Sequence, residues 1–205
     1  QSLRDFYAPQ AEGYDAFRER LLHGRETLVH LMAPPARGRV VEMGCGTGRN
    51  LDFFGARVET FQSFDLVDVC VPLLEQARRR AARWPGIVNV VEADAENYRP
   101  DHAVDCVYFS YSLSMTADWR KALCNAVRIL RPGGTLGVVD FFVSEDSPPP
   151  GLTRHGWLER QFWRRWFAHD GVRLDPRHLH ALMDRTDPMR IEQHRARIPW
   201  LPLLR

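Results

Sequence analysis

The sequence lacks long apolar runs, paired cysteines and internal repeats. No apolar run approaches the roughly 20 residues that a membrane-spanning helix needs, and the charged stretch from Arg4 to Arg25 contains no apolar core of a signal peptide. The four cysteines are scattered without a C-x-x-C pair, which argues against a zinc site or a disulfide scaffold and fits a reducing compartment. These absences predict a cytoplasmic globular protein that holds no metal ion.

The charge of the chain is small but unevenly distributed. A net charge of +2 over 205 residues gives no reason to expect a nucleic-acid partner. Residues 151–205, however, hold 11 arginines against 6 acidic residues, together with four of the six tryptophans. Such a basic, Trp-rich segment lies at a membrane surface, lines an anionic pocket, or forms an ordinary amphipathic helix with an aromatic core face.

Short apolar runs alternate with helical stretches through the middle of the chain. The runs expected to be strands are Arg39–Met43, Val58–Phe64, Ile87–Val91, Val104–Phe109 and Thr135–Phe142. The helical stretches between them are Gly48–Phe54, Val71–Arg83 and Asp118–Leu130. This rhythm predicts an α/β fold with a doubly wound, mostly parallel sheet and helices on both faces.

The flanking regions are predicted to be mainly helical. We expect helices within residues 5–32, at Trp157–Ala168 and at Pro176–Met183, and a strand near Arg190–Ile198. Pro148–Gly151 marks a hinge. The predicted organisation is one domain over residues 1–205, with an N-terminal helical lid (1–33), a cofactor-binding core (36–147) and the basic Trp-rich part (151–205).

A glycine-rich turn is the sharpest chemical signal. Val40–Gly48 ends the first predicted strand and opens a helix, where free backbone amides can meet a negative group. The spacing is G-x-G-x-G, and Arg49 stands where the third glycine of a dinucleotide-binding G-x-G-x-x-G would be, which disfavours a dehydrogenase. Glu42 precedes the first glycine by two positions.

Motif and placement together resemble the first motif of class I S-adenosylmethionine-dependent methyltransferases. The resemblance implies a Rossmann-like fold and S-adenosyl-L-methionine as cofactor. We expect Asp65 to end the second strand and accept hydrogen bonds from the ribose, and Asp94 to meet the adenine; helix-cap or loop roles are the alternatives, with Asp68 a second candidate cap. The implied cofactor-binding residues are Arg25, Glu42, Gly44, Cys45, Gly46, Thr47, Gly48, Asn50, Asp65, Leu66, Asp94, Ala95 and Ser110.

Longer strings narrow the resemblance. Phe6–Gln10, Gly46–Leu51, Ser110–Met115, Gly137–Phe141 and Phe162–Phe167 look like the methyltransferases of betaine-lipid synthesis. That likeness implies trimethylation of the amino group of diacylglyceryl-homoserine, peripheral membrane contact, and an aminocarboxypropyl transferase as a fused or separate partner. It also leads us to expect a further strand after Pro202, and therefore a truncated chain.

The acceptor side of the site is predicted by charge and by aromatic character. Tyr7, Tyr14 and Tyr111 suit a quaternary ammonium through cation–π contacts and are our catalytic candidates, with core packing as the alternative. The substrate-binding candidates are Arg18, Tyr111, Asp140 and Trp163. Two other functions stay open: a class I methyltransferase acting on a soluble small molecule or a quinone, and a non-catalytic cofactor-binding partner protein.

Overall fold

The chain divides into two compact units. The computed structural model describes residues 22–169, 171–188 and 190–194. The units are Gln1–Asp140 and Phe141–Arg205, so the boundary precedes the hinge expected at Pro148–Gly151. The organisation of the chain as one domain stays a prediction.

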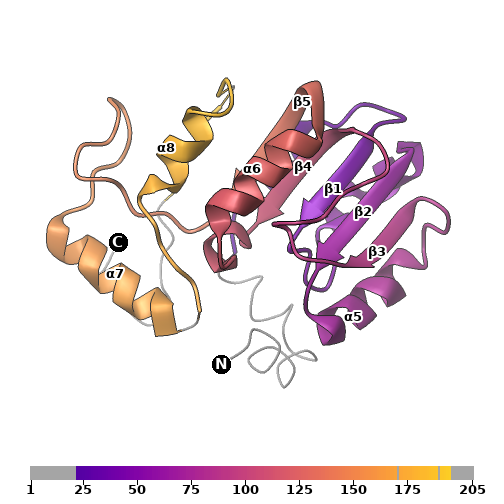
Figure 1. The fold of residues 1–205 in the computed structure, drawn as a ribbon, viewed down its shortest axis with the longest axis horizontal. Helices are drawn as coiled ribbons and strands as arrows, with labels where there is room; N and C mark the ends of the chain where they lie inside the picture. The colour runs from indigo at the N-terminus through magenta and orange to yellow at the C-terminus, as the bar shows by residue number, and fades with distance from the viewer. Residues whose placement is uncertain (1–21, 170, 189, 195–205) are drawn as a thin grey trace. The chain divides into compact units, whose positions relative to one another are not determined.

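The first unit is built on a parallel sheet of five strands in the order β3-β2-β1-β4-β5 (Figure 1). The strands are β1 (Arg39–Met43), β2 (Ser63–Asp68), β3 (Val88–Glu92), β4 (Val104–Ser110) and β5 (Leu130–Val139). Strands β1, β2 and β4 bury nearly all their side chains, as expected for a parallel sheet covered on both faces. The predicted fold class is confirmed.

Helices cover the sheet on two sides because the strand order reverses between β1 and β4. Right-handed crossovers that run outward in opposite directions place their helices on opposite faces. The helices of this unit are α3 (Arg25–Met32), α4 (Leu51–Phe54), α5 (Val71–Ala81) and α6 (Trp119–Ile129), with 3₁₀ turns at Gly55–Thr60 and Leu113–Met115. α3, α4 and α5 share one apolar cluster with alternate strand residues, whereas α6 packs on β4 and β5. Cys124 on α6 is exposed, and Cys45, Cys70 and Cys106 are buried.

Several predicted boundaries were wrong, including the end of the fifth strand, which is Val139 and not Phe142. Val58 lies in a 3₁₀ turn, so β2 begins at Ser63 and continues to Asp68. β5 begins at Leu130, and a register shift opposite Val104 and Cys106 accommodates the residues expected to form a turn before Thr135. α4 begins at Leu51, because the three glycines that precede it form a loop with positive φ angles.

The second unit contains α7 (Trp157–His169) and α8 (Arg177–Met183), close to the predicted helices. Ser144 and His155 hold one loop together: the Ser144 N–H donates to Nδ1 of His155 over 3.0 Å, and the His155 N–H donates to the Ser144 hydroxyl over 2.8 Å. Of the predicted strand Arg190–Ile198, residues 190–194 form no strand, and the rest lies outside the described residues. Among the helices of the described ranges, none has both the length and the apolar character to cross a bilayer.

Candidate cofactor site

The carboxyl ends of β2, β1 and β4 meet at the point where the strand order reverses. Met43, the last residue of β1, pairs with Val67 of β2 on one side and with Phe109 of β4 on the other. In open parallel sheets, ligands bind at this switch point. The glycine loop that follows Met43 therefore lies between Asp68, the end of β2, and Ser110, the end of β4.

The glycine loop is shaped by left-handed backbone at Gly44, Gly46 and Gly48, whose φ angles are 73°, 55° and 70°. The N–H groups of Gly44 and Cys45 both donate to the Val67 carbonyl, over 2.8 and 3.0 Å, which ties the loop to β2. A Cβ atom on Gly44 would stand 2.4 Å from the Cβ of Ser112. Glycine is thus required there by conformation and by space.

Asp68 is the carboxylate at the end of β2, and the prediction that Asp65 ends this strand was wrong. One Asp68 oxygen accepts the Gly46 N–H over 2.7 Å, and the other accepts the Cys70 N–H over 2.8 Å. This carboxylate therefore lies directly beside the glycine loop. The sequence signal was present as two carboxylates three residues apart, but the apolar run starting at Val58 placed the strand too early.

Asp65 and Leu66 lie inside the sheet. Asp65 accepts hydrogen bonds from the amide of Asn89 over 2.8 Å and from the hydroxyl of Tyr98 over 2.9 Å, and it is 9% exposed. Burial, followed by the Asp65 charge, raises the pKa of Tyr98, so the hydroxyl stays a donor. Leu66 is fully buried in the apolar cluster. The structure brings neither side chain to the loop as a ligand group.

Glu42 is buried beneath the loop in a network drawn from three elements. Its carboxyl accepts the Asn50 amide over 2.6 Å and the Tyr108 hydroxyl over 2.8 Å. Burial raises the pKa of Glu42 to about 7, although both hydrogen bonds and the charge of Arg25 oppose the shift. Arg25 is 8% exposed, and its guanidinium lies 5.3 Å from the centre of the Phe53 ring. Glu42, Asn50 and Arg25 are therefore buried polar groups of the interior, and a hydrogen bond joins Glu42 to Asn50 at the end of the glycine loop.

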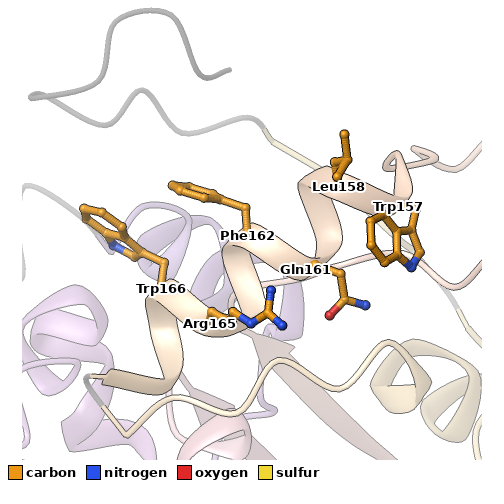
Figure 2. Close-up of a pocket in the computed structure, with 6 residues that line it drawn as sticks. All are labelled: Trp157, Leu158, Gln161, Phe162, Arg165 and Trp166. Carbon is orange, nitrogen blue, oxygen red and sulfur yellow. The ribbon is translucent and has the colours of Figure 1, made fainter.

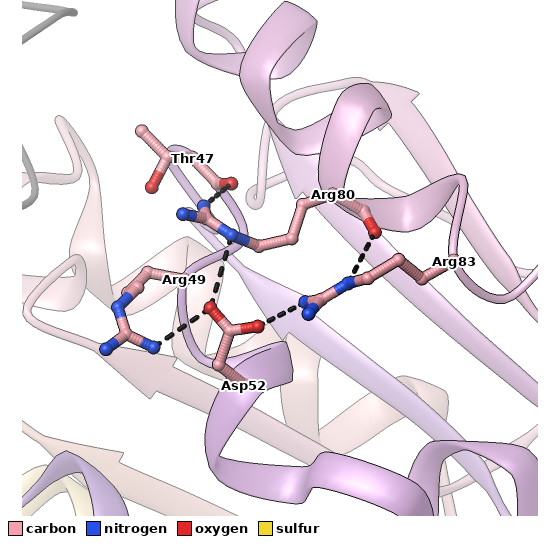
Figure 3. A network of polar contacts seen from close by, with 5 residues as sticks. All are labelled: Thr47, Arg49, Asp52, Arg80 and Arg83. Carbon is pink, nitrogen blue, oxygen red and sulfur yellow. Dashed lines mark hydrogen bonds and ion pairs between the residues drawn. The ribbon is translucent and has the colours of Figure 1, made fainter.

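Three arginines meet at Asp52 on the outer side of the loop (Figure 3). Arg49 donates to the Asp52 carboxylate over 2.9 Å, Nε of Arg80 lies 3.3 Å from it, and Arg83 also contacts it. Arg80 in addition donates to the Thr47 carbonyl over 2.6 Å. α5 is thereby joined to α4 and to the middle of the glycine loop. No sequence spacing pointed to Arg80, because its partners come from a different part of the chain.

Asp94 and Ala95 follow β3 in an exposed turn. The Asp94 carboxylate accepts the Glu96 N–H over 2.9 Å, and the Ala95 carbonyl accepts the amide of Asn125 over 2.7 Å. The loop role considered for Asp94 is thus present. Its predicted contact with adenine stays a prediction.

The acceptor-side candidates are only partly brought together. Tyr111 has a left-handed backbone (φ 54°), and its hydroxyl donates to the His23 carbonyl over 2.6 Å. Asp140 accepts hydrogen bonds from the N–H and the hydroxyl of Ser114, over 2.9 and 2.6 Å. Trp163 lies on α7 in the second unit. The remaining candidates, Tyr7, Tyr14 and Arg18, lie outside the described residues.

Two buried polar atoms near this edge of the sheet lack a hydrogen-bond partner among the described residues. Oγ of Ser110 and Oδ1 of Asn50 are inaccessible to solvent and have no hydrogen-bond partner in the described part of the chain. Buried polar atoms are normally paired, so an unpaired one at a switch point favours a ligand that supplies the partner. The glycine loop, Asp68 and Ser110 fit a nucleoside-containing cofactor with hydroxyl and amine donors.

Comparisons with known proteins identify the family to which the chain belongs. Residues 40–134 match the family described as "Methyltransferase domain". A demethylmenaquinone methyltransferase of Thermus thermophilus is 32% identical over 163 residues, which are 76% of this chain and 70% of the relative. A trans-aconitate 2-methyltransferase of Acidovorax ebreus is 29% identical over 156 residues, 76% of this chain and 58% of its own length.

A solved structure shares the fold. The N-methyltransferase NodS from Bradyrhizobium japonicum, in complex with S-adenosyl-L-homocysteine, is 23% identical, with a TM-score of 0.50 over 59% of this chain and 60% of that chain. At this identity the likeness concerns the fold alone. The glycine loop and the matched relatives together show that the chain belongs to the class I S-adenosylmethionine-dependent methyltransferases.

Proposed function

We propose that Asp68, rather than Asp65, binds the ribose hydroxyls of the cofactor. The support is its place at the end of β2 and its hydrogen bond from Gly46, which points the carboxylate along the loop. When bound, S-adenosylmethionine would supply an electrophilic methyl group, which the acceptor attacks in line while the C–S bond breaks and neutral S-adenosylhomocysteine leaves. The glycine loop amides would orient the cofactor, and the buried Ser110 hydroxyl would hydrogen-bond it at the end of β4.

The proposed acceptor is a molecule with a long apolar tail that carries the methylated group at its polar end. The first candidate is a demethylated quinone. The observation that supports it is the 32% identity to the demethylmenaquinone methyltransferase over 76% of this chain and 70% of that relative.

The second candidate is diacylglyceryl-homoserine, methylated at nitrogen to the trimethylated betaine lipid. Its support is the string Ser110–Met115, on which the resemblance to betaine-lipid methyltransferases depends. This string occupies the end of β4 and the turn after it, where the Ser112 hydroxyl donates to the Met43 carbonyl over 2.6 Å. A segment in this position borders the cofactor loop and is suited to select the acceptor.

A competition assay with mass-spectrometric detection tests both candidates. The full chain is incubated with deuteromethyl-labelled S-adenosylmethionine and three acceptors: a demethylmenaquinone, diacylglyceryl-homoserine, both in mixed micelles, and trans-aconitate in solution. One label on the quinone supports the first candidate, and up to three labels on the homoserine lipid support the second. The Gly44→Val variant serves as the inactive control.

Two results would contradict the proposal. Label on trans-aconitate alone would identify a soluble acid as the acceptor class and exclude the apolar tail. Cofactor binding by calorimetry without label on any acceptor, including other amines and quinones, would favour the non-catalytic alternative.

A further inference from the structure

One side of α7 is apolar and exposed. We define the outer face of α7 as Trp157, Leu158, Phe162 and Trp166, which are 63%, 75%, 38% and 48% exposed. Leu158, Phe162 and Trp166 are spaced four residues apart and project from the same side of the helix (Figure 2). With Gln161 and Arg165 they line an open groove. No residue of α7 is buried.

The outer face is not the side by which α7 packs in its own unit. Trp163 and Phe167 lie on the other side, where the Phe167 ring stacks on Phe141 with 4.5 Å between centroids and lies 6.0 Å from Trp163. Phe162 and Trp166, whose ring centroids are 5.7 Å apart, are therefore the more exposed aromatic residues of this part of the helix. The role of Trp163 in substrate binding stays a prediction. Packing among the residues of this unit that the structure describes therefore does not account for the apolar character of the outer face.

The charge around the outer face is positive. The only acidic residue of α7 is Glu159, and it accepts the Gly156 N–H at the start of the helix. Arg160 pairs with Asp146, whereas the exposed Arg164 and Arg165 form no ion pair with any residue that the structure describes. Arg165 lines the groove beside the apolar residues, and Arg164 adds a second positive charge to the same helix. An apolar face with positive charge beside it complements a lipid surface, which has an apolar interior and anionic headgroups.

We propose that the outer face of α7 docks on an anionic lipid bilayer, with Phe162, Trp166 and Leu158 at the headgroup boundary and Arg165 on lipid phosphates, while Arg164 adds to the positive charge of the helix. Helices with an aromatic apolar face and flanking arginines bind bilayers in this way, and indole rings favour the interface. This inference rests on the proposed apolar-tailed acceptor, since docking would bring the enzyme to the phase that holds such a molecule.

Vesicle flotation of the full chain tests the docking. The probes are vesicles of phosphatidylcholine alone and of phosphatidylcholine with phosphatidylglycerol. The wild-type protein should float with the anionic vesicles and dissociate in 0.5 M salt, a condition chosen to be well above physiological ionic strength at about 0.15 M. The Phe162→Ser/Trp166→Ser and Arg164→Gln/Arg165→Gln variants should each lower the partition coefficient about tenfold or more.

Matched control variants distinguish a specific role of the outer face of α7 from a general effect of removing any exposed leucine or arginine. Leu31→Ser removes an exposed leucine on α3, and Arg78→Gln/Arg79→Gln removes two adjacent exposed arginines on α5. Both controls should float like the wild type. Equal loss in the controls, equal binding to both vesicle types, or no binding at all would overturn the docking.

A second copy of the chain is the competing occupant of the face. Sedimentation of the wild type as a dimer that the Phe162→Ser/Trp166→Ser variant dissociates would overturn the bilayer proposal. Turnover in detergent micelles does not depend on vesicle docking. Turnover without flotation would therefore refute only the docking, and flotation without turnover on any acceptor would refute only the proposed function.

Discussion

The strands of the first unit and helix α7 of the second use apolar residues for opposite purposes. In β1, β2 and β4 the apolar side chains are almost all buried, and the buried Glu42 and Asp65 between them are hydrogen-bonded within the unit. In α7 no side chain is buried, and four large apolar ones, Trp157, Leu158, Phe162 and Trp166, are exposed. Apolar residues in the strands are thus accounted for by the core of the unit. The exposed apolar residues of α7 are not, and they favour a contact with something outside the described chain.

Gly44 gives the largest expected effect in the sheet unit. Gly44→Ala places a Cβ 2.4 Å from Ser112 on a left-handed backbone, so we expect a loss of about 3 kcal/mol in the free energy of unfolding and at least about a 100-fold rise in the cofactor Kd. Calorimetry and urea unfolding measure both. Gly86→Ala is the control, because Gly86 has a φ of 79° with open space around it. Equal losses in both variants would show that conformation alone matters.

Glu42 should make stability depend on pH. The folded carboxyl titrates near 7 and the ordinary value is 4.5, so the folded state holds a proton that the unfolded chain releases between these values. As pH rises from 4.5 to 7 the free energy of unfolding should fall by up to about 3 kcal/mol and then level off. Urea unfolding at several pH values tests this. The decline should be weaker in Glu42→Gln, and an identical decline in both proteins would assign it to other groups.

Variants of Asp68 and Asp65 compare a carboxylate at the edge of the sheet with one inside it. Asp68→Asn should raise the cofactor Kd by tens of fold, about 2 kcal/mol, because a charged acceptor for hydroxyl donors is lost. Asp65→Asn should lower the melting temperature through Asn89 and Tyr98 but leave the Kd within about twofold. If the two variants exchange these effects, the ribose contact belongs to Asp65.

Arg80 tests how much a contact from α5 to the glycine loop contributes to cofactor binding. Arg80→Gln removes the hydrogen bond to the Thr47 carbonyl and the contact with Asp52, and we expect a rise of about fivefold in the cofactor Kd, near 1 kcal/mol. Arg79→Gln on the same helix is exposed and should bind like the wild type. Calorimetric titration measures the cofactor Kd of both variants. Identical Kd values would show that the contacts of Arg80 with Thr47 and Asp52 do not affect cofactor binding.

The smallest effect is expected on α7. Leu158→Gln should change the free energy of unfolding by less than about 0.5 kcal/mol, since Leu158 is 75% exposed. Leu123→Ala on α6 should cost about 2–5 kcal/mol, because Leu123 is fully buried. Urea unfolding compares them. A large loss from Leu158→Gln would mean that the outer face is needed for folding.

Local signals in the sequence predicted the fold and part of the site. β1 lies where its apolar run is, and the glycine loop is where the G-x-G-x-G spacing placed it. The edge carboxylate was misassigned because a run of apolar residues does not reveal where a 3₁₀ turn ends and a strand begins. The contact of Arg80 with Thr47 depends on two distant segments meeting in space, which no spacing encodes.

The same reasoning applies to the helical part. The spacing of Leu158, Phe162 and Trp166 could have identified one face of α7 from the sequence, because residues four apart lie on one side of a helix. The contact between Phe141 and Phe167 was needed to tell which side of α7 packs against its own unit and which side is exposed. The spacing in the sequence shows which residues share one side of the helix, but only the packing contacts show whether that side faces the protein or the outside.

The distribution of thiols makes this protein easy to label at one position. Burial raises the pKa of Cys106 to about 12 and that of Cys45 well above its usual range, so both stay protonated and shielded, and Cys70 is also buried. Cys124 on α6 is exposed. Because maleimides react with accessible thiolates, one fluorophore can be attached at Cys124 in the native sequence. A dye on α6 would therefore need no engineered cysteine and no replacement of the other three thiols.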